Sequence, residues 1–221
     1  MLVVDAQSSD ATVGVAEAAG ATTLVRAWNG FVDARQFALS RVRTPWTFML
    51  DADERLDPTL QAALLAAAPE ERVAGYTVRR TTYLCGRPIA GAGWGNEVLL
   101  RLVRTHGATV AAAPAAGGTA ELHERLRAEG EVGALCGTLL HDSYPTLGSY
   151  WRKLQRYTAI EARGLRPSVL GFARAAALAP LRALWLLSVR GGWRDGWRGI
   201  VVCAGSALYP VLATAKAFVR K

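Results

Sequence analysis

Short apolar runs alternate with amphipathic segments along the first part of the chain. Apolar runs rich in β-branched and aromatic residues predict strands over residues 2–4, 22–25 and 46–50. The segments between them have helical periodicity over residues 11–19 and 31–42. This β-α-β-α-β order predicts an α/β fold with a mainly parallel sheet and flanking helices. Ligands bind such sheets beyond the carboxyl ends of the strands.

Carboxylates follow two of these predicted strands. Asp5 follows the first strand, with Ser8 in the polar loop after it, and Asp51 and Asp53 follow the third. Strand alternation points Asp51 and Asp53 the same way. Because an ionised carboxylate is costly to bury without a cation, we interpret the pair as the mouth of a metal site, with Asp5 on the same rim.

A simpler alternative is a solvated turn followed by a helix. Asp57 and Pro58 suit the N-cap and the first position of a helix over residues 59–68. Because Asp57 already provides the cap, Asp51 and Asp53 are left for another role.

Charge divides the chain into two parts. Residues 1–151 carry 13 basic and 16 acidic residues, a net charge of −3, whereas residues 152–221 carry 13 basic and 2 acidic residues, a net charge of +11. The basic part is also rich in Leu and Trp, and its uncharged stretch from Gly199 to Ala215 is interrupted by Pro210. We expect it to bind an anionic membrane surface as a peripheral or re-entrant segment. A helix pair packed on the domain is the alternative, and nucleic acid is not expected because the segment is too apolar.

Composition bounds the domain organisation. The 221 residues are 51% apolar, enough for one core and an appendage. We expect an α/β domain that carries the candidate site over residues 1–145, a linking helix over 146–165 and a basic, apolar, membrane-associated helical tail over 166–221. Three dispersed cysteines favour a reducing compartment, and no signal peptide is expected before the first strand.

The middle of the chain adds further candidates. Residues 73–84 and 98–103 predict strands, and the Gly-rich loop between them contains Trp94, which would either stack on a sugar or plug the core. Arg101 lies inside the second of these strands, where it would need an acidic partner if buried, and could equally face solvent. His141 follows two leucines at a predicted strand end, where metal binding and a simple hydrogen bond are both open.

Five strings occur in order within roughly residues 2–165, namely VVDAQSSDAT, WNGFVDARQFAL, LDADE, ELHERL and LLHDSY. Together they resemble the inverting GT-A glycosyltransferases of family 2, and within it the branch with lipopolysaccharide core glycosyltransferases. Members of that family begin with a strand and an Asn-Glu loop upstream of the position of Asp5. We therefore expect either a start assigned too late or a chain whose first strand is missing, with nucleotide binding most affected.

The resemblance implies a role for each candidate. Nucleotide-sugar binding would fall to Asp5, Ser8, Asp51 and Arg101, metal binding to Asp53 and His141, base catalysis to Glu124, and acceptor contacts to Trp94 and His123. The cofactor would be Mg or Mn, the donor a nucleoside diphosphate-sugar, and the acceptor a lipid-linked or cell-envelope glycan at the cytoplasmic face of the cell membrane. From the residues alone, Glu124 would be part of a solvated helical face. The alternative function is a non-catalytic, membrane-attached binding protein that keeps the fold and has lost donor binding.

Overall fold

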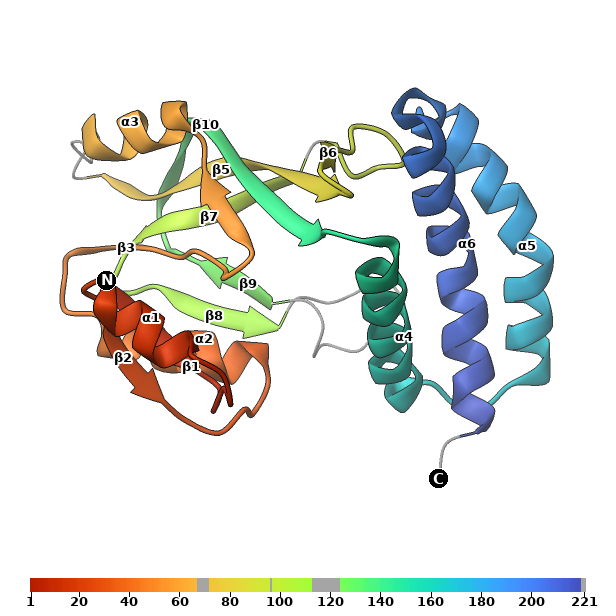
Figure 1. Cartoon of the computed structure of the whole chain (residues 1–221), viewed down its shortest axis with the longest axis horizontal. Coiled ribbons are helices and arrows are strands. Elements are labelled where there is room, and N and C mark those ends of the chain that lie inside the picture. The colour runs from red at the N-terminus through yellow and green to blue at the C-terminus, as the bar shows by residue number, and fades with distance from the viewer. Residues whose placement is uncertain (67–71, 96, 113–123, 220–221) are drawn as a thin grey trace.

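The computed structural model describes residues 1–66, 72–95, 97–112 and 124–219 (Figure 1). The strands are β1 (Leu2–Asp5), β2 (Thr22–Val25), β3 (Trp46–Phe48), β4 (Glu54–Leu56), β5 (Val73–Leu84), β6 (Arg87–Pro88), β7 (Glu97–Arg104), β8 (Thr109–Ala112), β9 (Glu124–Arg127) and β10 (Glu131–Tyr144). The helices are α1 (Thr12–Ala18), α2 (Phe31–Arg41), α3 (Pro58–Ala66), α4 (Leu147–Gly164), α5 (Val169–Ser188), the 3₁₀ turn η1 (Gly192–Asp195) and α6 (Gly196–Phe218).

A mixed sheet forms the centre of the N-terminal part. Its strands are ordered β3-β7-β5-β10-β4, and β6 pairs with the end of β5. Among the described residues of this sheet only β5 and β10 pair in parallel, so the expectation of a mainly parallel sheet is wrong in this detail. The parallel arrangement is inferred from the β-α-β-α-β order of the first three predicted strands, whereas the long β5 and β7 fold back on each other as an antiparallel pair.

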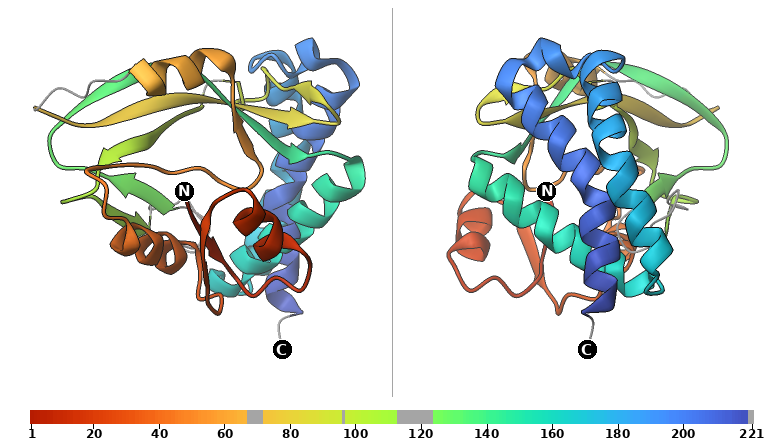
Figure 2. Two further views of the ribbon diagram at one scale, coloured as in Figure 1. Left: turned by 60° about the vertical axis from the view of Figure 1, so that its left-hand side comes forward. Right: turned by 90° about the vertical axis from the view of Figure 1, so that its right-hand side faces the viewer.

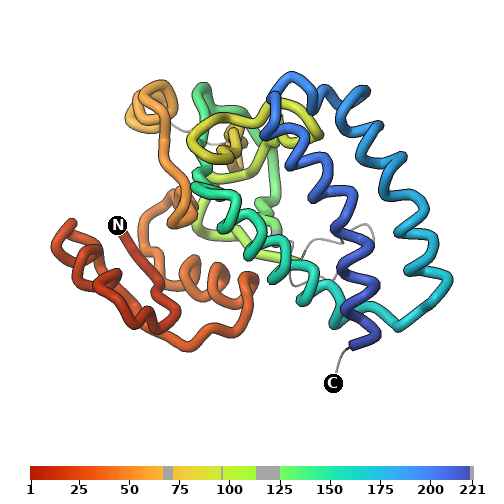
Figure 3. The backbone as a smooth tube through the Cα atoms, turned by 45° about the vertical axis from the view of Figure 1, so that its right-hand side comes forward, coloured from red at the N-terminus to blue at the C-terminus, as the bar shows by residue number. Residues whose placement is uncertain are grey.

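The first two strands pair with each other. β1 and β2 are parallel, as predicted, and form a two-stranded sheet of their own. Among the described residues neither strand is hydrogen-bonded to β3, whose partner is β7. The β1-α1-β2 unit therefore lies beside the mixed sheet rather than within it, as the trace in Figure 3 shows.

Helices cover the mixed sheet on both faces. Leu60 of α3 packs on Val78 and Leu139, and all three side chains are fully or almost fully buried. Leu39 of α2 packs with Val103 and with residues of β8. These two clusters form the hydrophobic core on the two faces of the mixed sheet, and Phe48 at the end of β3 packs against the Leu60 cluster.

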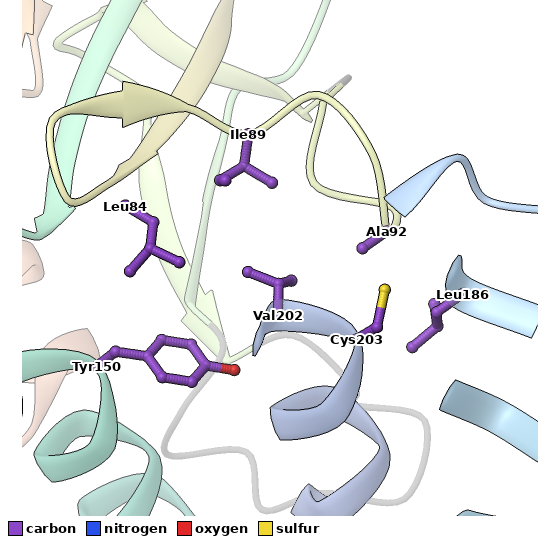
Figure 4. Close-up of a cluster of buried hydrophobic side chains, with 7 residues drawn as sticks. All are labelled: Leu84, Ile89, Ala92, Tyr150, Leu186, Val202 and Cys203. Carbon is purple, nitrogen blue, oxygen red and sulfur yellow. The ribbon is translucent and has the colours of Figure 1, made fainter. Parts of the chain in front are cut away.

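The C-terminal helices form a layer at one side of this domain. α4 begins with a capping box between Thr146 and Ser149, and α6 packs between α4 and α5 (Figure 2). A third cluster joins α4, α5 and α6 to the loop after β5, and Figure 4 shows Leu84 and Ile89 of this loop region facing Val202 of α6. The helical region is therefore packed on the sheet-containing part of the chain through a shared core.

Candidate active site

A tight turn after β3 carries the acidic residues. The carbonyl oxygen of Asp51 accepts a hydrogen bond from the backbone N–H of Glu54, and Glu54 begins β4. β4 then pairs antiparallel with β10, which places Glu54 opposite His141. The turn thus places Asp51 next to β7 and Asp53 next to β10, and it directs the Glu54 side chain into the protein interior.

Glu54 and Arg101 form a buried ion pair beneath this turn. The Arg101 Nη2 atom lies 2.5 Å from Glu54 Oε1 and 3.0 Å from Asp51 Oδ2. The Glu54 side chain is fully buried, and that of Arg101 is 4% exposed. The expectation that a buried Arg101 needs an acidic partner is confirmed. The geometry gives Arg101 a role in positioning Asp51, while its contact with nucleotide-sugar stays a prediction.

Two further arginines extend this network. Arg80 Nη1 lies 3.1 Å from Glu54 and Arg80 Nη2 2.7 Å from Glu97, while Arg35 of α2 contacts Asp51 at 2.7 Å. Burial alone would raise the pKa of Asp51, but the charges of Arg101 and Arg35 outweigh it and lower that pKa. Asp51 is therefore a fixed carboxylate held between two cations.

Asp53 lies at the tip of the turn and has different partners. Its Oδ2 atom is 3.2 Å from His141 Nε2 and 3.5 Å from the ammonium of Lys153, which α4 contributes. The other nitrogen of His141 contacts the Thr82 hydroxyl at 3.3 Å. The hydrogen bond with His141 is the main reason why the pKa of Asp53 is lowered, so this carboxylate is ionised at neutral pH.

His141 lies inside a strand rather than at its end. β10 continues to Tyr144, and His141 stands opposite Thr82 of β5 and Glu54 of β4. The prediction of a strand end is therefore wrong, because pairing with β4 and β5 extends β10 beyond the apolar run. The side chain still reaches Asp53, because it points toward the turn.

The donor set around Asp53 suits a hard divalent cation. Asp53 is 40% exposed, and the adjacent imidazole offers a second donor atom. Among the described residues no group of three His, Cys, Asp or Glu side chains gathers that could cage a metal alone. Mg²⁺ and Mn²⁺ accept one or two protein ligands and complete their shells with water and substrate phosphates. Asp53 and His141 therefore fit such an ion.

Asp5 and Ser8 form a separate local motif. The two oxygens of the Asp5 carboxylate accept hydrogen bonds from the Ser8 hydroxyl at 2.6 Å and the Ser8 backbone N–H at 2.8 Å. These hydrogen bonds lower the pKa of Asp5, and the bond from the Ser8 hydroxyl has the larger effect. In the described part of the chain no hydrogen bond or ion pair joins either residue to Asp51 or Asp53, so the shared rim stays a prediction.

The acceptor-side candidates are distributed differently. Trp94 is partly buried, with its ring centroid 5.5 Å from that of Tyr144 and 6.4 Å from that of Tyr150, so it packs at the margin of the third core cluster. Glu124 begins β9 opposite Ala112, in a strand rather than on a helical face. His123 lies outside the described residues. The catalytic role of Glu124 and the acceptor roles of Trp94 and His123 stay predictions.

Lys153 is one of two site residues that the sequence did not reveal. Its ammonium lies 2.6 Å from the Ser143 hydroxyl and within 6 Å of the ring centroids of Tyr144 and Tyr157. In the sequence Lys153 is one of several charged residues that lie between the apolar positions of a predicted helix. Its contact with Asp53, which only the structure shows, distinguishes it from those other charged residues. Glu54 was likewise missed as a buried partner, because nothing local shows which acid of the turn points inward.

Comparison with known proteins adds an independent finding. Residues 1–127 match the family described as Glycosyl transferase family 2. The chain is 30% identical over 233 residues to the lipopolysaccharide core biosynthesis glycosyltransferase LpsC of Rhizobium meliloti (strain 1021), an alignment that covers 100% of this chain and 83% of LpsC. Shorter stretches are 35% and 41% identical to uncharacterized glycosyltransferases of Rickettsia felis and Rickettsia prowazekii, covering 36% and 28% of this chain and 29% and 21% of those relatives.

Together with this match, the mixed sheet, its acidic turn and its flanking helices define a glycosyltransferase of the GT-A fold. The chain belongs to glycosyl transferase family 2 and is an enzyme of that family. The predicted fold class and the predicted resemblance are thereby confirmed.

Proposed function

We propose that this enzyme transfers a sugar, with inversion, from a nucleoside diphosphate-sugar to a lipid-linked or cell-envelope glycan acceptor in lipopolysaccharide core synthesis. The observation that carries the proposal is the position of Asp53, an exposed carboxylate on a turn anchored by the buried Arg101–Glu54 pair. The name of LpsC supports the acceptor class.

The proposed site assigns the charges to separate tasks. Asp53 and His141 would hold Mg²⁺ or Mn²⁺, and such an ion would supply positive charge that stabilises the departing nucleoside diphosphate. Asp5, Ser8 and Asp51 hold the nucleoside. Glu124 removes the acceptor proton on the opposite face of the sugar, as inversion requires of a general base.

The enzyme works at the cytoplasmic face of the membrane in this proposal. Two helical segments, Val169–Ser188 and Gly192–Phe218, are long and apolar enough to cross a bilayer. Side chains along α5 are widely exposed, including Leu170, Leu181 and Leu184. Exposed apolar surface beside a net charge of +11 is suited to an anionic bilayer.

The contacts of the α5–α6 hairpin favour peripheral association over a crossing. At its tip, the Asp195 carboxylate accepts hydrogen bonds from the backbone N–H groups of Ala90 and Gly91. At its other end, Lys216 Nζ donates to the Gln155 carbonyl oxygen of α4 at 2.7 Å. A crossing hairpin would have its two ends on opposite sides of the bilayer, whereas here the tip is bonded to the loop after β5 and the other end to α4.

Asp53→Asn tests the catalytic proposal. The variant should weaken Mn²⁺-dependent binding of UDP or GDP and reduce sugar transfer at least about a hundredfold, roughly 2.7 kcal/mol of barrier. The matched control is Asp57→Asn, which removes a nearby carboxylate and keeps a good helix cap. Unchanged transfer in Asp53→Asn would remove Asp53 from the site. If the wild-type enzyme binds neither nucleotides nor nucleotide-sugars in a broad panel, the non-catalytic binding protein becomes the better interpretation.

A further inference from the structure

An open groove of about 650 Å³ runs between α5 and α6. Its wall on α5 includes Ala175 and Ala179, and its wall on α6 includes Ala207 and Pro210. Small side chains at these positions leave space where two helices would otherwise interdigitate. The volume lies within the roughly 300–1,000 Å³ range of small-molecule sites in proteins.

Two arginines flank this apolar groove. Arg174 and Arg182 both contribute to its lining and are separated by eight residues of α5, or about 12 Å along the helix axis. Both residues are exposed, and in the described part of the chain neither guanidinium forms an ion pair. Anionic oxygens that approach the groove would therefore meet two available cations.

The rest of the hairpin provides no competing negative charge. Asp195 is the single acidic residue between positions 169 and 218, and two backbone N–H groups already occupy its carboxylate. Near the tip three exposed tryptophans each lie beneath an arginine, in the pairs Trp185–Arg190, Trp193–Arg194 and Trp197–Arg198. Trp and Arg side chains of this kind are typical of the headgroup zone of a bilayer.

We propose that the α5–α6 groove is a binding site for one anionic phospholipid, whose acyl chain lies along Ala175 and Ala179 and whose phosphate is held by Arg174 and Arg182. This inference rests on the proposed membrane association and deepens it. The apolar lining excludes a free phosphate as the occupant, and the two guanidiniums select an anionic over a zwitterionic headgroup.

Native mass spectrometry of the full chain in detergent tests the site, with phosphatidylglycerol and phosphatidylcholine as probes. The wild-type protein should retain one phosphatidylglycerol molecule and release phosphatidylcholine. Filling the groove with Ala175→Leu and Ala179→Leu should abolish retention. The matched control, Ala176→Leu with Ala177→Leu, adds the same volume at exposed positions outside the groove lining and should retain the lipid.

A second variant does not depend on repacking the helices. Arg174→Ala with Arg182→Ala removes two exposed side chains, and should lower phosphatidylglycerol retention about tenfold while circular dichroism stays unchanged. Equal retention in the groove-filled and wild-type proteins, or equal retention of both lipids, would overturn the proposal.

Vesicle sedimentation separates this proposal from the one on which it rests. The groove-filled protein should still sediment with phosphatidylglycerol vesicles, because its Trp and Arg side chains at the tip are intact. If the wild-type protein fails to sediment, membrane association itself is wrong. If it sediments but retains no lipid molecule in detergent, only the groove site is wrong.

Discussion

The guanidinium of Arg101 lies 2.5 Å from the carboxylate of Glu54, and both side chains are almost completely buried. Arg101 comes from the middle of β7 and Glu54 from the start of β4, at two different positions in the mixed sheet. The same guanidinium also contacts Asp51. One buried pair therefore fixes the turn that presents Asp53, so the shape of the candidate site depends on a charge pair in the protein interior.

Removing one member of the Arg101–Glu54 pair should strongly destabilise the folded protein. Glu54→Gln leaves the buried charge of Arg101 poorly compensated, and should lower the free energy of unfolding by about 3–5 kcal/mol. Glu97→Gln is the matched control, because Glu97 pairs with Arg80 but is 42% exposed, and a surface pair contributes only about 0–1 kcal/mol. Urea denaturation in mild detergent measures both. A cost for Glu54→Gln no larger than the control would show that the pair does not anchor the turn.

Asp51 should make the stability of the folded protein depend on pH at low pH. Its pKa is lowered in the folded state, so its ion pairs contribute stability that is fully present above the unfolded value of about 3.9 and is lost as the pH falls through the folded value. The wild-type protein should therefore be more stable than Asp51→Asn at pH 7, and this difference should shrink below about pH 4. Glu131→Gln, at an exposed pair with Arg72, should show no such difference. A gap between wild type and Asp51→Asn that is constant with pH would contradict the assignment.

Lys153 should compete with a metal ion for Asp53. Removing a positive charge 3.5 Å from a partly exposed carboxylate should strengthen Mn²⁺ binding by about fivefold, on the order of 1 kcal/mol after solvent screening. Electron paramagnetic resonance of free Mn²⁺ with the Lys153→Met variant measures this directly, without nucleotide. Arg152→Met removes the same charge from an exposed position on α4 and should change the affinity little. An equal effect in both variants would show that Lys153 acts only through the overall electrostatic potential of the protein and not through its contact with Asp53.

Glu124 should matter to chemistry and little to donor binding. Glu124→Gln keeps the size of the side chain but cannot accept a proton, so transfer should fall by roughly 10² to 10⁴ while nucleotide affinity stays within a few fold. Glu129→Gln, at an exposed position between β9 and β10, is the control. Unchanged transfer would leave Glu124 as a surface residue. Loss of nucleotide affinity would assign it to the donor or metal site, with Asp142 or Glu97 as the next candidates for the base.

The sequence predicted those features that depend on neighbouring residues. The Asp57 carboxylate accepts a hydrogen bond from the Leu60 backbone N–H at 2.7 Å, as its assignment as an N-cap required, and β5 covers the predicted residues 73–84. The first two strands and the helices between the first three strands are also present. Each of these follows from capping chemistry or periodicity within a few residues.

Features that depend on distant partners could not be predicted in the same way. The need of Arg101 for an acid was predictable, but the choice of Glu54 follows from a turn that rotates one carboxylate inward and leaves Asp53 exposed. The contact of Lys153 with Asp53 spans a hundred positions of the chain, because it depends on how α4 packs after β10. Strand β10 likewise passes through His141 because of pairing with β4 and β5.

The tip of the α5–α6 hairpin is fixed to the loop after β5 by the hydrogen bonds of Asp195 with Ala90 and Gly91. A Cβ atom on Gly91 would collide with the backbone of Gly191, so loop and tip touch without room to slide. With α5 resting on lipid, Asp53 would therefore stand at one fixed height above the bilayer. The enzyme would then select acceptors by length, because a membrane-anchored glycan brings its terminal hydroxyl to that height only when it has grown to the matching length.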